Sequence, residues 1–507
     1  MSFSRHDEVE RKFEPGSSAS LPRLDDIEGV SSIGQAVEAK LMAVYFDTDD
    51  FALARRGITL RRRTGGEDAG WHLKLPVAKD TRSEVRLPLG RATKTVPAAL
   101  LGPVRALVRD RPLVQVARVR TRRLEYDLVG LDDVVLAKVC DDEVHAERLD
   151  DAGPVQDWRE WEVELVDGTN GLLDLVEQRL LAVGASPAGP SKLVRTLGDL
   201  VPPQPERPSR KQLSRGSAAQ LVLAHLGEHT EELHQQDARL RSDLPGSVHK
   251  LRIATRRLRS ALKTYQPLLG SADADHLGDE LRWLGQSLSK ARDAQVMRER
   301  LQQLIAAEPA ELVLGPVAQR IDDDLSSEYK AGHEQGVAAV ETERYFRLLD
   351  ALDQLISSPA LTSEADAPAK QVIPRLLGRD GKRLRREVRK VSRAETMEER
   401  DLALHEARKK AKRLRYAAES AVPVFPKRAK KLATSAKRVQ EALGEHQDAV
   451  VARHKLREYG ARTHLSGENG FTFGRLHALE QARAEDAVRR FEAAWDRLDV
   501  KRMARMR

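Results

Sequence analysis

The sequence RHDEVERKFEP, residues 5–15, carries like charges at every second position. In a β-strand, successive side chains point to opposite faces. Glu8, Glu10 and Lys12 would therefore share one face, and Val9 and Arg11 the other. A solvent-exposed strand also accounts for such a pattern, because charged residues are usually exposed. The remaining predicted strands decide between a solvated face and an enclosed one.

Length and composition indicate a globular protein of two or three domains, because 507 residues exceed what one hydrophobic core serves. Lys and Arg total 86 against 78 Asp and Glu, a formal charge of +8 that favours an anionic partner. The single cysteine, Cys140, excludes an intrachain disulfide and fits a reducing compartment. We find neither a signal-peptide pattern nor a membrane-spanning apolar run. We therefore expect a cytoplasmic protein without membrane contact.

Residues 201–210, VPPQPERPSR, divide the chain. Four prolines among ten residues, without apolar periodicity, are typical of a linker. Residues 1–200 contain short runs rich in Val, Leu and Arg between turn residues, which predict antiparallel strands. Residues 211–507 contain long segments with 3.6-residue apolar spacing, which predict helices. The expected fold class is an α+β domain followed by an all-α domain.

The same alternation sorts charge in the later predicted strands. Apolar residues occupy one face of each strand, while acids concentrate on the other face of the first and last strands and cations fill those between. The charged positions that share a face are Arg61 and Arg63; His72 and Lys74; Glu84 and Arg86; Arg118, Arg120 and Arg122; and Glu160, Glu162 and Glu164.

A closed barrel turns such charged faces inward and packs the apolar faces against flanking helices. Buried like charges are costly without partners, so the interior must hold an anion and a cation together. Carboxylates suit Mg²⁺ or Mn²⁺, and guanidinium and ammonium groups suit phosphates. The expected metal ligands are Glu8, Glu10, Glu162 and Glu164. The expected phosphate ligands are Lys12, Arg61, Arg63, Lys74, Arg118 and Arg120.

The ordered motifs resemble the CYTH family, also called triphosphate tunnel metalloenzymes. They are EVERK at 8–12, YFDT at 45–48, LRRR at 60–63, WHLKLP at 71–76, REWEVEL at 159–165 and SK at 191–192. The resemblance implies a closed, eight-stranded antiparallel tunnel with flanking helices and metal-dependent hydrolysis of triphosphates. It also adds Lys192 to the phosphate ligands.

Hydrolysis in such a tunnel would use the metal and the basic lining to position a triphosphate for in-line attack by water. Glu8, Glu10 and Lys12 are the expected catalytic residues, and the sequence does not select the carboxylate that orients the water. Two alternatives remain open. One is a non-catalytic polyphosphate-binding protein, and the other is an enzyme for an organic triphosphate, through hydrolysis of thiamine triphosphate or nucleotide cyclisation.

A repeat runs through the helical half. HKLRIATRRLR begins at His249, and HEARKKAKRLRY begins at His405, 156 residues later. Each copy places a histidine and three cations at steps of 3, 4 and 3, which follow one helical face beside an apolar stripe. The repeat predicts two similar helical bundles. The two basic stripes are His249, Arg252, Arg256 and Arg259, and His405, Arg408, Lys412 and Arg415.

These copies resemble the CHAD family, helical domains named for conserved histidines, over residues 211–500. The resemblance implies two four-helix bundles whose basic surface binds inorganic polyphosphate. The first copy has Ser289 where the second has Gly444 and the family usually has glycine. We do not expect nucleic acid as a partner, because 4% aromatic content supplies few platforms for stacking bases. No protein partner is indicated.

The alternation in the opening stretch is testable. If Lys12 faces an enclosed site and Arg11 does not, Lys12→Ala weakens triphosphate binding by about tenfold or more, as expected for a lost hydrogen bond to a charged group. Arg11→Ala leaves binding nearly unchanged. Calorimetric titration of both variants measures the difference, and equal, small effects would restore the solvated strand.

Overall fold

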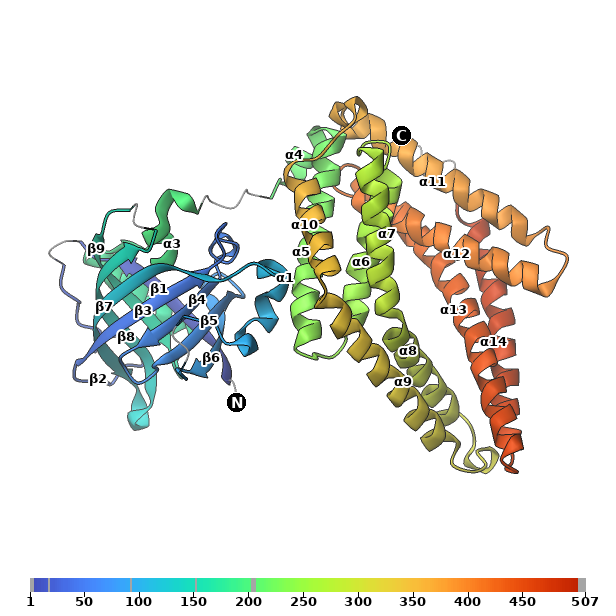
Figure 1. The fold of residues 1–507 in the computed structure, drawn as a ribbon, viewed down its shortest axis with the longest axis horizontal. Coiled ribbons are helices and arrows are strands. Elements are labelled where there is room, and N and C mark those ends of the chain that lie inside the picture. Colours follow the sequence, from blue (N-terminus) through green and yellow to red (C-terminus); the bar gives the residue numbers. More distant parts are fainter. Residues whose placement is uncertain (1–3, 17–18, 92–93, 151–152, 202–206, 500–507) are drawn as a thin grey trace. The chain divides into compact units, whose positions relative to one another are not determined.

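The computed structural model describes residues 4–16, 19–91, 94–150, 153–201 and 207–499. The chain forms two compact units, Met1–Glu206 and Arg207–Arg507 (Figure 1). Within the expected linker at 201–210, residues 202–206 lie outside the described residues. Helix α4, Arg210–Arg215, begins after Ser209, whose side chain takes part in a capping box.

The first unit is built around a closed antiparallel barrel of eight strands, as the sequence predicts. The strand order is β1-β6-β5-β4-β3-β7-β8-β9, and β9 pairs with β1 again. Strand β1 makes this closure by pairing with β6 over residues 4–9 and with β9 over residues 10–13. The barrel strands are β1 (Ser4–Glu14), β3 (Val37–Asp47), β4 (Thr59–Thr64), β5 (Gly70–Pro76), β6 (Thr81–Pro88), β7 (Val114–Val129), β8 (Val135–Arg148) and β9 (Gln156–Leu165).

Short strands and helices complete this unit. The strands β2 (Ser32–Ile33) and β10 (Ser186–Pro187) pair with β7 and β1. The α-helices are α1 (Arg105–Val108), α2 (Asn170–Ala182) and α3 (Lys192–Leu197). The 3₁₀ turns are η1 (Ala54–Arg56), η2 (Ala98–Leu100), η3 (Gly102–Val104), η4 (Leu131–Asp133) and η5 (Gly198–Leu200).

The outer faces of the strands are apolar where helices cover them. Trp161 and Val163 of β9 pack with Val176 of α2 in one buried cluster. Trp71 of β5 packs with Leu100 of η2 in a second. Because alternate residues point the other way, this packing turns the charged residues of β5 and β9 into the barrel.

Helix α3 fills one end of the barrel interior. Leu193 and Leu197 of this helix pack against Tyr45, Val119 and Val144, which come from β3, β7 and β8. The interior is therefore divided into an apolar part beside α3 and a charged part beyond it. This division decides which side chains of β7 face inward.

The second unit contains two helical repeats, which confirms the predicted duplication. The first comprises α5 (Ala218–Arg241), α6 (Ser247–Tyr265), α7 (Ser271–Ser287), α8 (Ser289–Ala306), α9 (Val317–Val340) and α10 (Glu343–Ser357), with η6 (Ala310–Leu312). After η7 (Ser363–Asp366), the second comprises α11 (Ala369–Val391), α12 (Met397–Ser420), α13 (Pro426–Leu465) and α14 (Phe471–Asp496). Helices α6 and α12 carry the basic stripes. The starts of α5 and α11 lie side by side through a bridge between Ser217 and Pro368.

The two repeats differ where the sequence has serine in place of glycine. Helix α7 ends at Ser287 and α8 begins at Ser289, whereas α13 continues unbroken through Gly444. Arg252 donates to the carbonyl oxygen of Ser289 at 2.9 Å, so it binds one of the backbone groups that this break frees. Among the described residues, no helix has the length and apolar character needed to cross a membrane.

Candidate active site and cationic centre

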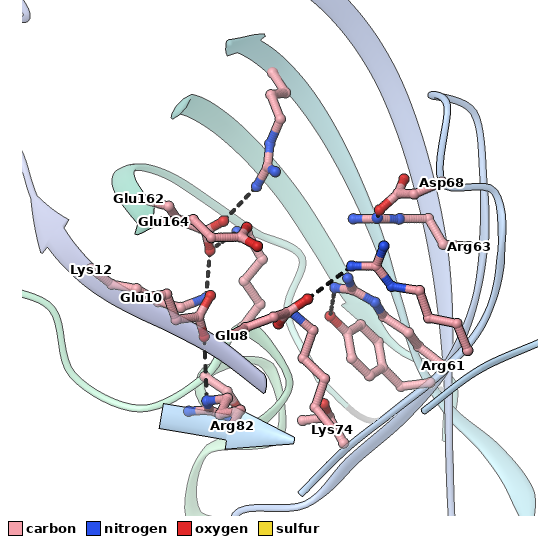
Figure 2. A pocket seen from close by; sticks show the side chains of 16 residues that line it. Glu8, Glu10, Lys12, Arg61, Arg63, Asp68, Lys74, Arg82, Glu162 and Glu164 are labelled. Atoms are coloured by element: carbon pink, nitrogen blue, oxygen red, sulfur yellow. Dashed lines mark hydrogen bonds and ion pairs between the residues drawn. The ribbon is translucent and has the colours of Figure 1, made fainter. Parts of the chain in front are cut away.

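One pocket inside the barrel gathers most of the expected tunnel residues. It is a cavity of about 70 Å³. The expected residues that line it are Glu8, Glu10, Lys12, Arg61, Arg63, Lys74, Glu162, Glu164 and Lys192. The lining is completed by Tyr45, Thr59, Asp68, Arg82, Arg86, Arg123 and Ser191. Figure 2 shows the glutamates of β1 and β9 on one side, with Arg61 and Arg63 of β4 facing them.

Two glutamates lie directly opposite each other where β1 meets β9. The register pairs Glu10 with Glu164, and like charges in such positions destabilise a sheet. Glu162, two residues earlier in β9, instead accepts a hydrogen bond from Lys12. Within the described chain, Glu164 forms no ion pair or side-chain hydrogen bond. Burial and the neighbouring Glu8 raise the pKa of Glu164 to about 7, so it lacks a positive partner.

Cations of β5 and β6 neutralise the other carboxylates of β1. Glu8 accepts from Lys74 at 2.5 Å and from Arg86 at 2.8 Å. Glu10 lies 3.3 Å from the guanidinium of Arg82. The β1 carboxylates thus have positive partners drawn from the same lining that would serve a phosphate chain.

Lys192, the first residue of α3, lies among three carboxylates at the apolar end of the pocket. Its ammonium group is 2.8 Å from Asp142, 2.6 Å from Glu160 and 2.8 Å from Glu162. Burial alone would lower the pKa of Lys192, but these carboxylates raise it well above its usual value. The hydroxyl of Ser191 caps α3 and holds this end of the helix in place.

Two groups of side chains have potential ligand atoms close enough to share one metal ion. They are His6, Glu8 and Glu84, and Asp142, Glu160 and Glu162, each group within 4.8 Å. Each group contains one expected metal ligand, while Glu10 and Glu164 line the same pocket. These carboxylate oxygens are the donors that Mg²⁺ and Mn²⁺ prefer.

Arg118 and Arg120 do not line this pocket, so the predicted orientation of β7 is wrong at these positions. Their side chains are 34% and 53% exposed, and both lie within 4.0 Å of Glu147. The inward positions belong to Val119 and Arg123. The physical reason is α3, because its buried leucines require an apolar partner and Val119 supplies one.

In the helical unit, the two basic stripes meet. Burial, with Arg408 and Arg256, lowers the pKa of Lys412 to about 7, so cations of α6 and α12 lie within electrostatic reach of one another. The Nε atoms of Arg256 and Arg408 are buried, and neither finds a hydrogen-bond partner within the described residues. We call this group the cationic centre. It comprises Arg252, Arg256, Arg292, Arg408 and Lys412.

The two histidines border the cationic centre in different ways. Burial and the neighbouring Arg292 lower the pKa of His249, so its neutral form is favoured. His405 forms a hydrogen bond of 2.8 Å with Gln447 of α13. Both histidines thus have neighbours that account for them structurally.

The last cation of each stripe lies apart from the centre. Burial, with Arg282 of α7, lowers the pKa of Arg259. Arg415 donates to Glu419 at 2.7 Å within α12. The stripes therefore converge in their first part and diverge towards their ends.

Family models match both units. A CHAD domain model matches residues 224–457 and a CYTH domain model matches residues 6–196. An uncharacterised protein of Mycobacterium tuberculosis, present in two strains, is 41% identical over 517 residues, which cover 98% of this chain and 97% of the relative. The chain belongs to the CYTH and CHAD families.

Three solved structures have lower similarity to this CYTH–CHAD protein. PptA from Streptomyces chartreusis is 21% identical with a TM-score of 0.47, covering 55% of this chain and 99% of its own. The CHAD domain from Ricinus communis is 23% identical with a TM-score of 0.45, covering 57% and 94%. A putative adenylyl cyclase from Hippeastrum, described as having a dominant triphosphatase activity, is 17% identical with a TM-score of 0.24, covering 38% and 98%.

Several pocket residues of the CYTH unit escaped the sequence prediction. Arg82 of β6 shares its face with Glu84 and Arg86, so the alternation already contained the signal for it. Asp142 of β8 had no such signal, because its strand reads as apolar with scattered acids. Arg123 follows Arg122 directly, and only the packing of α3 selects which of the two faces inward.

The inward position of Arg123 has a measurable consequence. Arg123 donates to both oxygens of Asp142 at 2.7 Å and has a side chain that is 14% exposed. Arg123→Gln leaves buried carboxylate charge uncompensated, so we expect a loss of about 3–5 kcal/mol in the free energy of unfolding. Arg120→Gln should change it by less than about 0.5 kcal/mol. Urea denaturation of both variants measures this, and equal losses would contradict the observed register.

Proposed function

We propose that the CYTH unit hydrolyses inorganic triphosphate, or a related triphosphate, with Mg²⁺ or Mn²⁺ as cofactor. The observation that carries the proposal is one pocket in which glutamates of β1 and β9 face a lining rich in cations. The opposed Glu10 and Glu164 fit a divalent ion, because no side chain neutralises both. The proposed metal ligands are Glu8, Glu10, Glu162 and Glu164.

The cations of the pocket would bind and orient the phosphate chain. Burial and the neighbouring Arg61 lower the pKa of Arg63 to about 9, which shows that this part of the lining lacks negative charge. A phosphate oxygen placed there stabilises the guanidinium groups and is held by them. The proposed phosphate ligands are Lys12, Arg61, Arg63, Lys74 and Lys192, joined by Arg82, Arg86 and Arg123.

Binding would exchange ion-pair partners inside the pocket. Lys74 is held by Glu8, and Lys12 by Glu162. When bound, a divalent metal neutralises charge on the terminal phosphoryl group and the leaving group. The glutamates then face the metal, and the released ammonium groups bind phosphate oxygens.

Glu164 is suited to accept the proton of the attacking water. Its carboxylate has two oxygens, so one can face the metal while the other forms a hydrogen bond with water. Its pKa of about 7 lies near the operating pH, where a general base is most effective. Lys12 and Lys74 have no such role, because they are held as cations by carboxylates.

The activity has a direct test in the full-length protein. Glu10→Gln should lower the turnover of inorganic triphosphate by about 100-fold or more while the protein remains folded, because it removes a metal ligand. Glu143→Gln, which alters an exposed glutamate outside the pocket, is the matched control and should keep full activity. Phosphate release with and without Mg²⁺ or Mn²⁺ is the measurement.

Normal turnover by Glu10→Gln, or full activity in excess chelator, would contradict the assignment. A panel of nucleotides, thiamine triphosphate and long-chain polyphosphate tests the organic-triphosphate alternatives. Binding of triphosphate without release of phosphate or pyrophosphate would favour the non-catalytic alternative.

We propose further that the CHAD unit binds inorganic polyphosphate at the cationic centre. The supporting observation is the buried, unpartnered nitrogens of Arg256 and Arg408 beside Lys412. A chain of phosphates supplies acceptors to several such groups at once. The unit's low aromatic content argues against base stacking, so a bare phosphate chain fits better than nucleic acid.

Polyphosphate binding at this centre should depend on pH through Lys412. Its pKa is about 7, and a bound polyanion raises it, so the complex takes up a proton and affinity falls as the pH rises above 7. Lys412→Met should flatten this dependence. Replacing Arg252, Arg256, Arg408 and Lys412 together by alanine should remove most of the affinity.

Titration calorimetry in buffers of different ionisation enthalpy measures the proton uptake. The same slope with pH in Lys412→Met and in the unmodified protein would contradict this role. Easy displacement of polyphosphate by single-stranded RNA or duplex DNA, without the reverse, would identify the unit as a nucleic-acid module.

A further inference from the structure

Helix α11 presents an outward face that is almost entirely cationic. Eight of its positions are exposed, and seven are Lys or Arg, the exception being Gln371. The opposite face is buried and apolar, with Leu376, Leu377 and Leu384 in the core. We call the central part of the exposed face the α11 cationic face. It comprises Arg379, Lys382, Arg386, Arg389 and Lys390.

Few acids compensate this face. Glu387 is buried and pairs with both Arg386 and Lys390, which lie at 3.3 Å and 2.8 Å. Within the described residues, no ion pair involves Arg379, Lys382 or Arg389. An exposed helix gains stability from paired charges at steps of three and four and loses it from like charges. The arrangement therefore costs helix stability and needs another explanation than folding.

The duplication supplies an internal comparison. Helix α5 opens the first repeat as α11 opens the second, and the two begin side by side. The exposed positions of α5 are Gln220, Glu228 and Gln235. Across all its residues α5 has four acids and two arginines, whereas α11 has two acids and nine cations. The repeat scaffold does not require the charge, since the equivalent helix lacks it.

The chemistry of the α11 cationic face selects its partner. It carries no aromatic residue for stacking bases, and no exposed apolar residue that would enter a lipid interface. Its five cations recur every turn over about 17 Å of helix, at 1.5 Å per residue. A flexible chain with one charge per phosphate can follow such a row by backbone contacts alone.

We propose that the α11 cationic face is a second docking surface of the CHAD unit, which binds the part of a long inorganic polyphosphate chain that extends beyond the cationic centre. The inference rests on the polyphosphate binding proposed above and adds a dependence on chain length. Short chains occupy the centre alone. Long chains occupy both sites, and the second contact raises the affinity through effective concentration.

The test compares chain lengths in the full-length protein. We replace Arg379, Lys382, Arg386 and Arg389 together by glutamine, which retains helix propensity and leaves Lys390 to pair with Glu387. Long-chain affinity should fall by about tenfold or more, and the slope of log affinity against log salt should lessen by about 2 to 3. Affinity for short-chain polyphosphate should stay within about twofold, because the cationic centre is intact.

The matched control removes four exposed cations from other helices of the same unit. Arg298, Lys330, Arg347 and Arg489 are changed to glutamine, which gives the same net charge. This control should bind long chains nearly as the unmodified protein does. An equal loss in both variants would overturn the proposal in favour of a general charge effect.

Two further outcomes would also overturn the inference. Unchanged long-chain affinity in the α11 variant would show that the face does not touch polyphosphate. A loss of RNA or duplex DNA binding, without a loss of polyphosphate binding, would assign the face to nucleic acid. Failure of the cationic centre is distinguished separately, because in that case the unmodified protein would not bind short chains.

Discussion

The closure of the barrel through β1 is the constraint on which the candidate active site depends. This strand pairs with β6 in its first half and with β9 in its second. The second pairing sets Glu10 opposite Glu164 and Lys12 opposite Glu162. An open sheet would leave these side chains in water, where their repulsion is slight. Closure places them in a shared interior, where charge must be compensated.

Compensation inside the barrel is local and incomplete, and both properties matter. Lys192 and Arg123 neutralise the acids beside α3, so the apolar end of the tunnel can be buried without loss. Towards β1, Glu164 keeps no positive partner, while Arg63 at the other wall is deprived of negative charge. A metal bound to an anion corrects both imbalances at once. Either species alone would correct one and worsen the other, which is why the two are proposed to bind together.

Alternation along the strands was enough to predict the inward residues of β1, β4, β5 and β9. It failed for β7 because four of its residues, Arg120 to Arg123, contain cations on both faces. There the orientation is decided by Val119, which packs on α3, a contact between segments far apart in the chain. The motif YFDT shows a different limit. Asp47 within it accepts backbone N–H groups of Leu53 and Ala54, so it orders a turn, and sequence alone does not separate such a residue from a ligand.

The helical unit shows how duplication separates what the fold needs from what binding needs. Both repeats keep the buried stripes of α6 and α12, since their leucines and alanines form the bundle cores. Both also keep the first cations beside them, although burial there lowers the pKa of Lys412 and leaves Arg256 short of acceptors. Retention of such a cost in two copies is explained by a shared anionic ligand and not by stability. The cationic face of α11 follows the opposite logic. It occurs in one repeat only, so the two-fold scaffold supports an asymmetric surface, and a ligand that contacts it must approach the unit from the side of the second repeat.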